Sequence, residues 1–152
     1  MKHWPFLLLL SLQIGGFVSW AQPVPSPPPC GVIYVTPNGS GSGTRQSPAG
    51  LTNGLSQVTP TNNVIWLAAG TYTLNNEISI PNNVTLEGGF DPSTWVKSNA
   101  TPSIIDRTAT NVLPAPANAL VGLAGLNASG FGLQDLTINV ADAPGPEVSV
   151  YG

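Results

Sequence analysis

Few side chains in this chain of 152 residues can carry acid–base or metal chemistry. Its seven acidic residues are scattered singly, and Asp106–Arg107 is the one adjacent acid–base pair. Glycoside hydrolases use paired carboxylates, and Ca²⁺ sites use several clustered oxygen ligands. In a fold built of stacked β-coils, Asp106 and Asp135 would fit one face of successive coils. Neither of them, however, has a second carboxylate within a few residues. We therefore interpret Asp106–Arg107 as the end of a strand, and we predict no catalytic residue, metal ligand or cofactor in this chain.

Histidine and cysteine are almost missing from the sequence. The one histidine is His3, and it lies in a predicted secretion signal, so the mature chain would contain no histidine. This excludes Ser-His-Asp and Cys-His catalysis and histidine-based zinc or iron sites within the chain. Cys30 is the one cysteine, so an internal disulfide is excluded. A free thiol, a bond to another chain and an inert buried thiol remain open for Cys30, and we favour no function.

Two tryptophans could stack on sugar rings. Trp66 lies in an apolar segment, which favours a place in the core. Trp95 follows the polar residues Asp91–Thr94 and is the better surface candidate. We predict a weak carbohydrate contact at Trp95 and Asp91, with a polysaccharide or a cell-surface glycan as the partner. The same segment is also typical of a plain β-turn, with Asp91 at the first position and Pro92 at the second.

The N-terminus has the three parts of a cleavable secretion signal over residues 1–21. Lys2 precedes an apolar run over 6–12, and the small residues Ser19 and Ala21 occupy the −3 and −1 positions of a cut after Ala21. The apolar stretch is too short and interrupted to span a membrane. Residues 22–31 form a proline-rich spacer. We therefore predict a secreted or cell-surface protein without a membrane span after signal cleavage.

Charge is scarce in the predicted mature chain. Charged residues make up 7% of the sequence, and removal of Lys2 with the signal leaves three bases against seven acids. Such a surface cannot neutralise a row of phosphates, so nucleic acid is excluded as a partner. The 41% of hydrophobic residues predicts an ordered domain.

Short apolar segments separated by turn residues predict an all-β domain over residues 32–152. A Gly/Ser loop is predicted over 38–44 and a second loop over 91–102. Ser47 as N-cap and Pro48 in the first turn predict a short helix that ends at Val58, with Leu51, Leu55 and Val58 on its apolar face. The predicted strands are 32–35, 64–67, 71–74, 77–80, 84–87, 103–106, 120–123, 133–138 and 148–150.

One segment is repeated in the sequence. Residues 62–66, Asn-Asn-Val-Ile-Trp, recur 20 positions later as Asn-Asn-Val-Thr-Leu over 82–86. A strand-length unit that recurs without an intervening helix is typical of a parallel β-solenoid, in which each coil covers its neighbour. Asparagine suits the bends because it tolerates left-handed backbone. An antiparallel β-sandwich remains the alternative fold.

Several motifs resemble secreted bacterial right-handed parallel β-helix proteins of the pectin-lyase-like superfamily. Residues 33–43 resemble the entry strand and loop of large surface members, and 48–58 resemble their N-terminal capping helix. Residues 65–72, Ile-Trp-Leu-Ala-Ala-Gly-Thr-Tyr, resemble the motif of their first coil, and 86–95 are similar to a Gly-Gly-Phe segment common in them. The resemblance implies that 32–152 is the N-terminal part of a β-helix domain.

The resemblance indicates fold better than activity, so several functions stay open. We expect a non-catalytic structural or adhesive segment of an exported β-helix surface protein. The alternatives are an N-terminal fragment of a polysaccharide lyase or glycoside hydrolase, and a small carbohydrate-binding module that uses Trp95. Because the sequence stops directly after a predicted strand and lacks a capping pattern, we expect a truncated chain.

Overall fold

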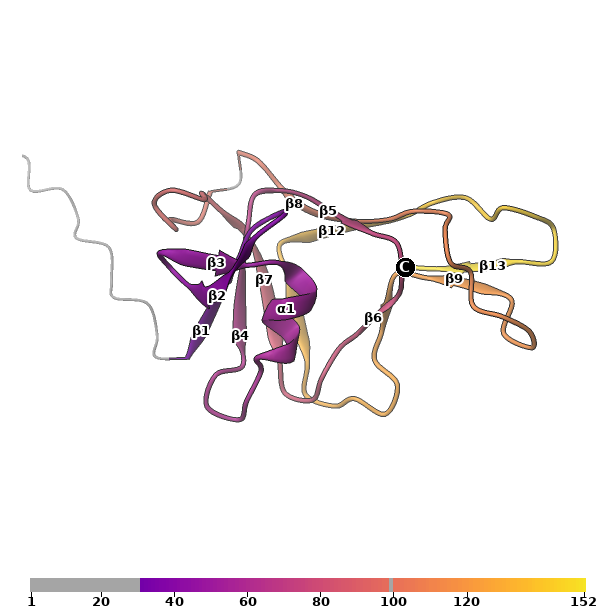
Figure 1. Cartoon of the computed structure of the whole chain (residues 1–152), viewed down its shortest axis with the longest axis horizontal. Coiled ribbons are helices and arrows are strands. Elements are labelled where there is room, and N and C mark those ends of the chain that lie inside the picture. The colour runs from indigo at the N-terminus through magenta and orange to yellow at the C-terminus, as the bar shows by residue number, and fades with distance from the viewer. Residues whose placement is uncertain (1–30, 99) are drawn as a thin grey trace, which may run out of the picture.

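A computed structural model describes residues 31–98 and 100–152, which form an all-β domain with one short helix (Figure 1). The predicted signal over 1–21, Cys30 and the proline-rich spacer up to that cysteine lie outside the described residues. The elements are β1 Val32–Val35, β2 Ser40–Thr44, β3 Ser47–Ala49, α1 Leu51–Ser56, β4 Val64–Ala68, β5 Gly70–Leu74, β6 Ile78–Ser79, β7 Thr85–Phe90, β8 Ser103–Arg107, β9 Ala119–Val121, β10 Leu123–Ala124, β11 Gly132–Gln134, β12 Leu136–Val140 and β13 Ser149–Tyr151.

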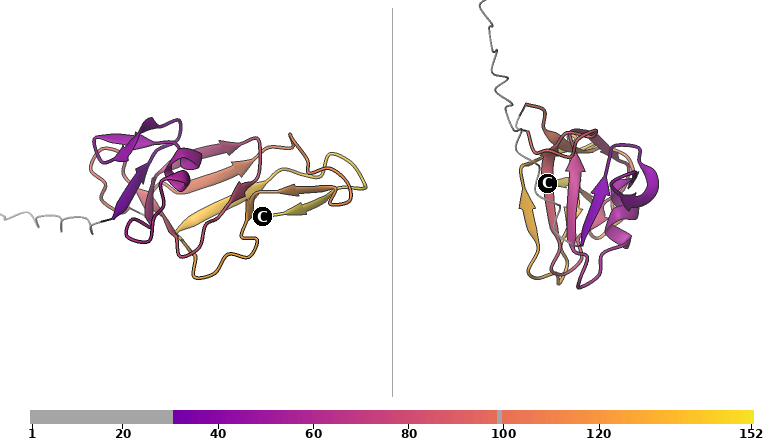
Figure 2. Two further views of the ribbon diagram at one scale, coloured as in Figure 1. Left: turned by 60° about the horizontal axis from the view of Figure 1, so that its bottom comes forward. Right: turned by 90° about the vertical axis from the view of Figure 1, so that its left-hand side faces the viewer.

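The chain runs through three successive coils whose strands pair in parallel. The first coil contains β4, β5 and β6, the second contains β7 to β10, and the third contains β11, β12 and β13. One sheet aligns β1, β4, β7 and β11, a second aligns β5, β8 and β12, and smaller sheets pair β6 with β10 and β9 with β13. The strands surround a common interior (Figure 2). Because this pairing is parallel, the alternative of an antiparallel β-sandwich is wrong.

The internal repeat marks two strands that lie side by side, with a register one residue longer than the sequence suggested. Ile65 pairs with Leu86, and both side chains are fully buried. A match at 20 residues would put Ile65 opposite Thr85, and a slip of one residue sends every side chain to the other face. Asn83 absorbs the extra residue at the bend, with a left-handed φ of 54°. Its carbonyl accepts a 2.7 Å hydrogen bond from the Asn63 side chain.

The core consists of inward-facing columns that cross the coils. Ile33, Ile65 and Leu86 form one column along β1, β4 and β7, and Tyr72 pairs with Ile105 in the second sheet. These residues belong to one buried cluster. Full burial of such a side chain contributes about 1.5–3 kcal/mol, so each coil stabilises the coil beside it.

The N-terminal helix is shorter than predicted and starts later. Residues 47–49 form strand β3, which pairs with β1 and with β2, and the N-cap of α1 is Gly50 without a side-chain hydrogen bond. Ser47 is therefore not the N-cap. The buried Ala49, whose carbonyl accepts from Thr36 N–H at 3.0 Å, holds this segment extended. Leu51 and Leu55 are buried as predicted for the apolar face, whereas Val58 lies beyond the end of α1 at Ser56 and packs against the core from there.

Three other predicted elements also differ from the structure, and one of them, the predicted strand 120–123, is divided at Gly122 into β9 and β10. Residues 40–44 form strand β2, not a loop, because glycines allow close approach to β3: a Cβ at Gly41 would lie 2.3 Å from the Ser47 carbonyl oxygen. The predicted strand 133–138 is split into β11 and β12 by Asp135, whose φ is 51°. Such a left-handed residue turns the chain from one sheet to the next.

Candidate functional site

Asp91 organises the loop between β7 and β8. One of its carboxylate oxygens accepts hydrogen bonds from the Ser93 and Thr94 amides and from the Thr94 hydroxyl, at 3.0, 2.8 and 2.9 Å. Its carbonyl accepts from the Trp95 amide at 2.8 Å. The bonds from the Thr94 amide, the Thr94 hydroxyl and the Ser93 amide lower the pKa of Asp91 below its usual value. The turn predicted at Asp91–Thr94 is confirmed, and one oxygen of the Asp91 carboxylate is occupied within the loop.

The side chain of Trp95 is buried, so its prediction as a surface residue is wrong. Its exposed fraction is 6%, and its ring meets the edge of Tyr34 with 4.7 Å between centroids. A left-handed backbone at Trp95, with φ 57°, turns the side chain back over the sheet after the polar turn. In this conformation neither face of the indole forms an open platform for a sugar ring. The carbohydrate contact predicted at Trp95 and Asp91 therefore lacks the exposed aromatic face on which a sugar ring would stack.

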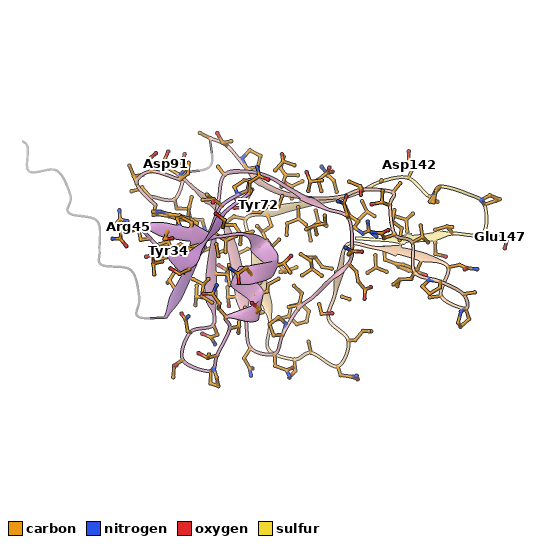
Figure 3. The ribbon with its side chains drawn as sticks, in the orientation of Figure 1. Tyr34, Arg45, Tyr72, Asp91, Asp142 and Glu147 are labelled. Carbon is orange, nitrogen blue, oxygen red and sulfur yellow. The ribbon has the colours of Figure 1, made fainter. Side chains whose placement is uncertain are left out.

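Four aromatic side chains form a cluster on the outer face of the first sheet: Tyr34, Trp66, Phe90 and Trp95. Trp66 stacks on Phe90 at 4.3 Å with 16° between the rings, and meets Tyr34 edge-on at 5.7 Å. Such pairs contribute about 0.5–1.5 kcal/mol beyond burial of their area. Trp66 is half-buried and packs as predicted, although in this outer cluster and not among the columns inside the coils. Figure 3 shows Tyr34 and Asp91 at the same end of the molecule.

Lys97 joins two carboxylates beside this cluster, and sequence reasoning missed the arrangement. Its ammonium contacts the carboxylates of Glu87 and Asp135 and lies 5.8 Å from the centre of the Phe90 ring. Hydrogen bonds to Asp135, and then to Glu87, raise the pKa of Lys97. The chain reverses its direction over Asp91–Trp95, and this reversal places Lys97 beside β7. Asp135 comes from the bend that follows β11. No local pattern in the sequence indicates this contact between the second and third coils.

The Glu87–Lys97–Asp135 cluster fastens the loop to the sheet. One ammonium is shared by two carboxylates, which leaves a local charge of −1. Neither carboxylate faces a second acid without the intervening cation, as a general acid and its nucleophile would in a glycosidase. A partly exposed ion pair of this kind adds at most about 1 kcal/mol. We therefore assign the cluster a structural role.

The other candidates for catalysis are separated by the fold. Along β8, Arg107 points inward, whereas Asp106 lies on the opposite side of the strand. Asp106 pairs in register with Asn139, while Asp135 precedes Leu136 at the other end of the same ladder. The two aspartates are therefore not neighbours. The interpretation of Asp106–Arg107 as the end of a strand is confirmed, since β8 ends at Arg107.

Arg107 is a buried cation held by backbone oxygens. Its Nε donates to the Val121 carbonyl at 3.0 Å, and its two terminal nitrogens donate to the carbonyls of Thr108 and Asn111 at 2.7 and 3.0 Å. The guanidinium thus ties the end of β8 to the loop that leads to β9. Its donors point at fixed carbonyls and not at a cleft, which makes Arg107 a structural residue.

The described residues contain no group of three His, Cys, Asp or Glu side chains placed to hold a metal ion. Within the same ranges, no helix is long and apolar enough to cross a membrane. The chain matches no protein-family model, no curated protein and no solved structure.

Replacement of Asp91 by Asn should destabilise the protein in a pH-dependent way. A carboxylate whose pKa is lowered by folding contributes stability that is complete above the unfolded pKa of about 3.9 and is lost as the pH falls through the folded value. We expect Asp91→Asn to be less stable than the wild type above about pH 5, and the gap to close below about pH 3.

Urea unfolding between these pH values measures the difference. Asp142→Asn removes an equal charge from an exposed residue at the opposite end of the molecule (Figure 3) and serves as the control. The prediction would be contradicted if the difference in unfolding free energy between Asp91→Asn and the wild type stayed constant with pH, or if it matched the difference measured for the control.

Proposed function

We propose that this chain is a non-catalytic structural segment of an exported, right-handed parallel β-helix surface protein. The observation that carries the proposal is the in-register parallel stacking of β4, β7 and β11, with β5, β8 and β12 beside them. Stacked coils of this kind build a long scaffold from units that each contact only their neighbours. The motifs that resemble the pectin-lyase-like superfamily support the same assignment.

The contacts made by the polar side chains support the proposed role as a scaffold. Asp91 forms a turn, Glu87 and Asp135 share Lys97, and Arg107 binds backbone carbonyls. Side chains at the bends also join successive coils: the Asn111 amide donates to the Asn76 side chain, and the Thr108 hydroxyl donates to that of Asn75, both at 3.0 Å. These groups hold the stack together.

The inner surface of the third coil supports the idea of a segment within a longer stack. Leu86 and Leu120 in the second coil are fully buried, yet their register partners Leu133 and Val150 in the third coil are each 40% exposed. An apolar side chain at an inward position normally contacts the next coil. A further coil on this side would bury both residues.

An activity assay with acidic polysaccharide tests the non-catalytic part of the proposal. The purified chain is incubated with polygalacturonate, with and without Ca²⁺, and both new unsaturated ends and new reducing ends are measured. We expect neither to rise above the buffer control. Cleavage that is lost in Asp106→Asn or Glu87→Gln would overturn the proposal in favour of a lyase or hydrolase.

Export is tested separately on the native protein. The protein is captured from the extracellular fraction of its source cells with an antibody to residues 31–152, and its N-terminus is determined by mass spectrometry. We expect a mature N-terminus at Gln22. Intracellular protein that retains residues 1–21 would overturn the assignment of export without affecting that of the fold.

A further inference from the structure

A cleft of about 620 Å³ lies between helix α1 and residues 73–81, at the N-terminal side of the first coil. Figure 1 shows α1 on one side of this region and β6 on the other. The helix contributes Thr52, Leu55 and Ser56, and the opposite wall comes from the end of β5, the bend and β6. The volume lies in the ordinary range for ligand sites.

The cleft exists because the cap covers only one side of the first coil. On that side β1 continues the sheet beyond β4, and α1 packs closely on β1: a Cβ at Gly54 would lie 2.6 Å from the Val35 side chain. Among the described residues, β5 and β6 form the edges of their sheets. The cleft therefore has a helix on one side and an open sheet edge on the other.

Backbone groups along this edge are directed into the cleft. The amides of Ile78 and Ile80 donate to the carbonyls of Gly122 and Ala124 in the next coil, at 3.0 and 2.8 Å. In a parallel strand the N–H and C=O of one residue point to the same side, and successive residues alternate. The N–H and C=O of Ser79 consequently point away from the next coil and towards the cleft.

The side chains of the cleft define the class of ligand. Its floor is apolar and consists of Leu55, Leu74, Ile78 and Ile80, all of them buried. Among the described residues that line the cleft, Glu77 is the one with a charge, and both ion pairs in this part of the chain use Lys97, so Glu77 can pair with a cation on a ligand. The same lining residues include no aromatic ring to stack on a sugar and no base to attract an anion.

We propose that this cleft binds an extended peptide segment that carries a Lys or Arg. The segment adds as a strand to the edge at β6, where its backbone pairs with Ser79. Alternate side chains of the peptide pack between Leu55 and Ile78, and its cation pairs with Glu77. Strand addition combines backbone hydrogen bonds for affinity with side-chain pockets for specificity. This binding activity is additional to the proposed scaffold role and does not depend on it.

Fluorescence anisotropy with the 152-residue chain tests the proposal. The probes are six acetylated, labelled hexapeptides that alternate Val and Thr, with one Lys placed at each position in turn. We expect saturable binding by at least one register. Substitution of its Lys by Glu should abolish binding, and N-methylation of alternate amides should weaken it at least about fivefold, since a backbone hydrogen bond is lost. N-methylation of the other amides should have little effect.

Protein variants identify the site. Glu77→Gln should weaken the Lys peptide about three- to fivefold and leave a norleucine version of it unchanged. Asp142→Asn, which removes an equal charge from an exposed residue outside the cleft lining, should have no effect. Circular dichroism verifies that both variants are folded.

Four results would overturn the proposal: no peptide of the set binds, all N-methylated forms bind equally well, Glu77→Gln matches the control, or the neutral hexasaccharide maltohexaose binds and the peptides do not. Assembly of the chain through this edge in place of peptide binding, detected by sedimentation, would also overturn it.

Discussion

Arg107→Met is expected to lower the free energy of unfolding by about 2–4 kcal/mol, the larger of the two strongest effects predicted for this protein. The exposed fraction of Arg107 is 1%, and its guanidinium donates to three backbone carbonyls, those of Val121, Thr108 and Asn111. Methionine fills a similar volume but has no donor. The carbonyls would then lose their partner in a place that water reaches poorly, and buried acceptors without a partner are costly.

Two further variants separate hydrogen bonding from charge. Arg107→Lys keeps the charge but offers a single nitrogen, so we expect an intermediate loss. Arg45→Met removes an exposed arginine that donates one hydrogen bond, to the Thr94 carbonyl at 2.7 Å, and should change stability by less than about 0.5 kcal/mol.

Chemical denaturation with urea at pH 7 measures all three variants. An Arg107→Met midpoint equal to that of the wild type would mean that the loop from Thr108 to Val121 does not need the guanidinium. Equal losses in Arg107→Met and Arg45→Met would attribute the effect to net charge.

Gly88→Ala is expected to destabilise the protein by about 1–3 kcal/mol, because the added methyl group has no room. A Cβ at Gly88 would lie 2.4 Å from the Asp135 carbonyl oxygen, 2.7 Å from the Leu136 side chain and 2.9 Å from Cβ of Ser103. The first of these contacts is with backbone, so relief requires the third coil to move away from the second. Residue 88 is glycine because two coils meet at that point.

Gly132→Ala is the matched control for this prediction. A Cβ at Gly132, in the neighbouring strand of the same sheet, would meet the Thr85 side chain at 3.5 Å or more, which is ordinary van der Waals contact. We expect this variant to be near neutral. Thermal unfolding followed by circular dichroism compares the two, and equal melting temperatures would contradict the steric interpretation.

The stacked arrangement was predictable because its evidence is local. Apolar residues between turn residues mark most strands, and the repeat of 62–66 at 82–86 indicates that β4 and β7 occupy equivalent places. The side chains themselves set the register. Inward positions must be apolar, and Asn83 accepts the left-handed backbone that lets Ile65 meet Leu86.

The features that escaped prediction depend on contacts between distant residues. The sequence around Gly39 and Gly41 is typical of a flexible loop, yet both glycines lie against β3, where any larger side chain would collide with backbone. Trp95 follows a polar turn, yet its left-handed backbone conformation directs the indole ring into a buried position against Tyr34. Lys97 finds Asp135 only because the third coil passes beside the loop.

The arrangement of the ladders also affects how such a chain can change over generations. Each strand of the second coil is hydrogen-bonded to the first coil or to the third, and β7 and β8 are bonded to both. The loop 91–102 projects from the stacked strands between β7 and β8. Residues inserted there would lengthen the loop without displacing Ile65 from Leu86 or Tyr72 from Ile105. Duplication or loss of one whole coil would likewise preserve the strand pairing within the coils that remain. The architecture therefore allows growth by whole coils, and inserted residues disturb it least where the chain leaves the paired strands.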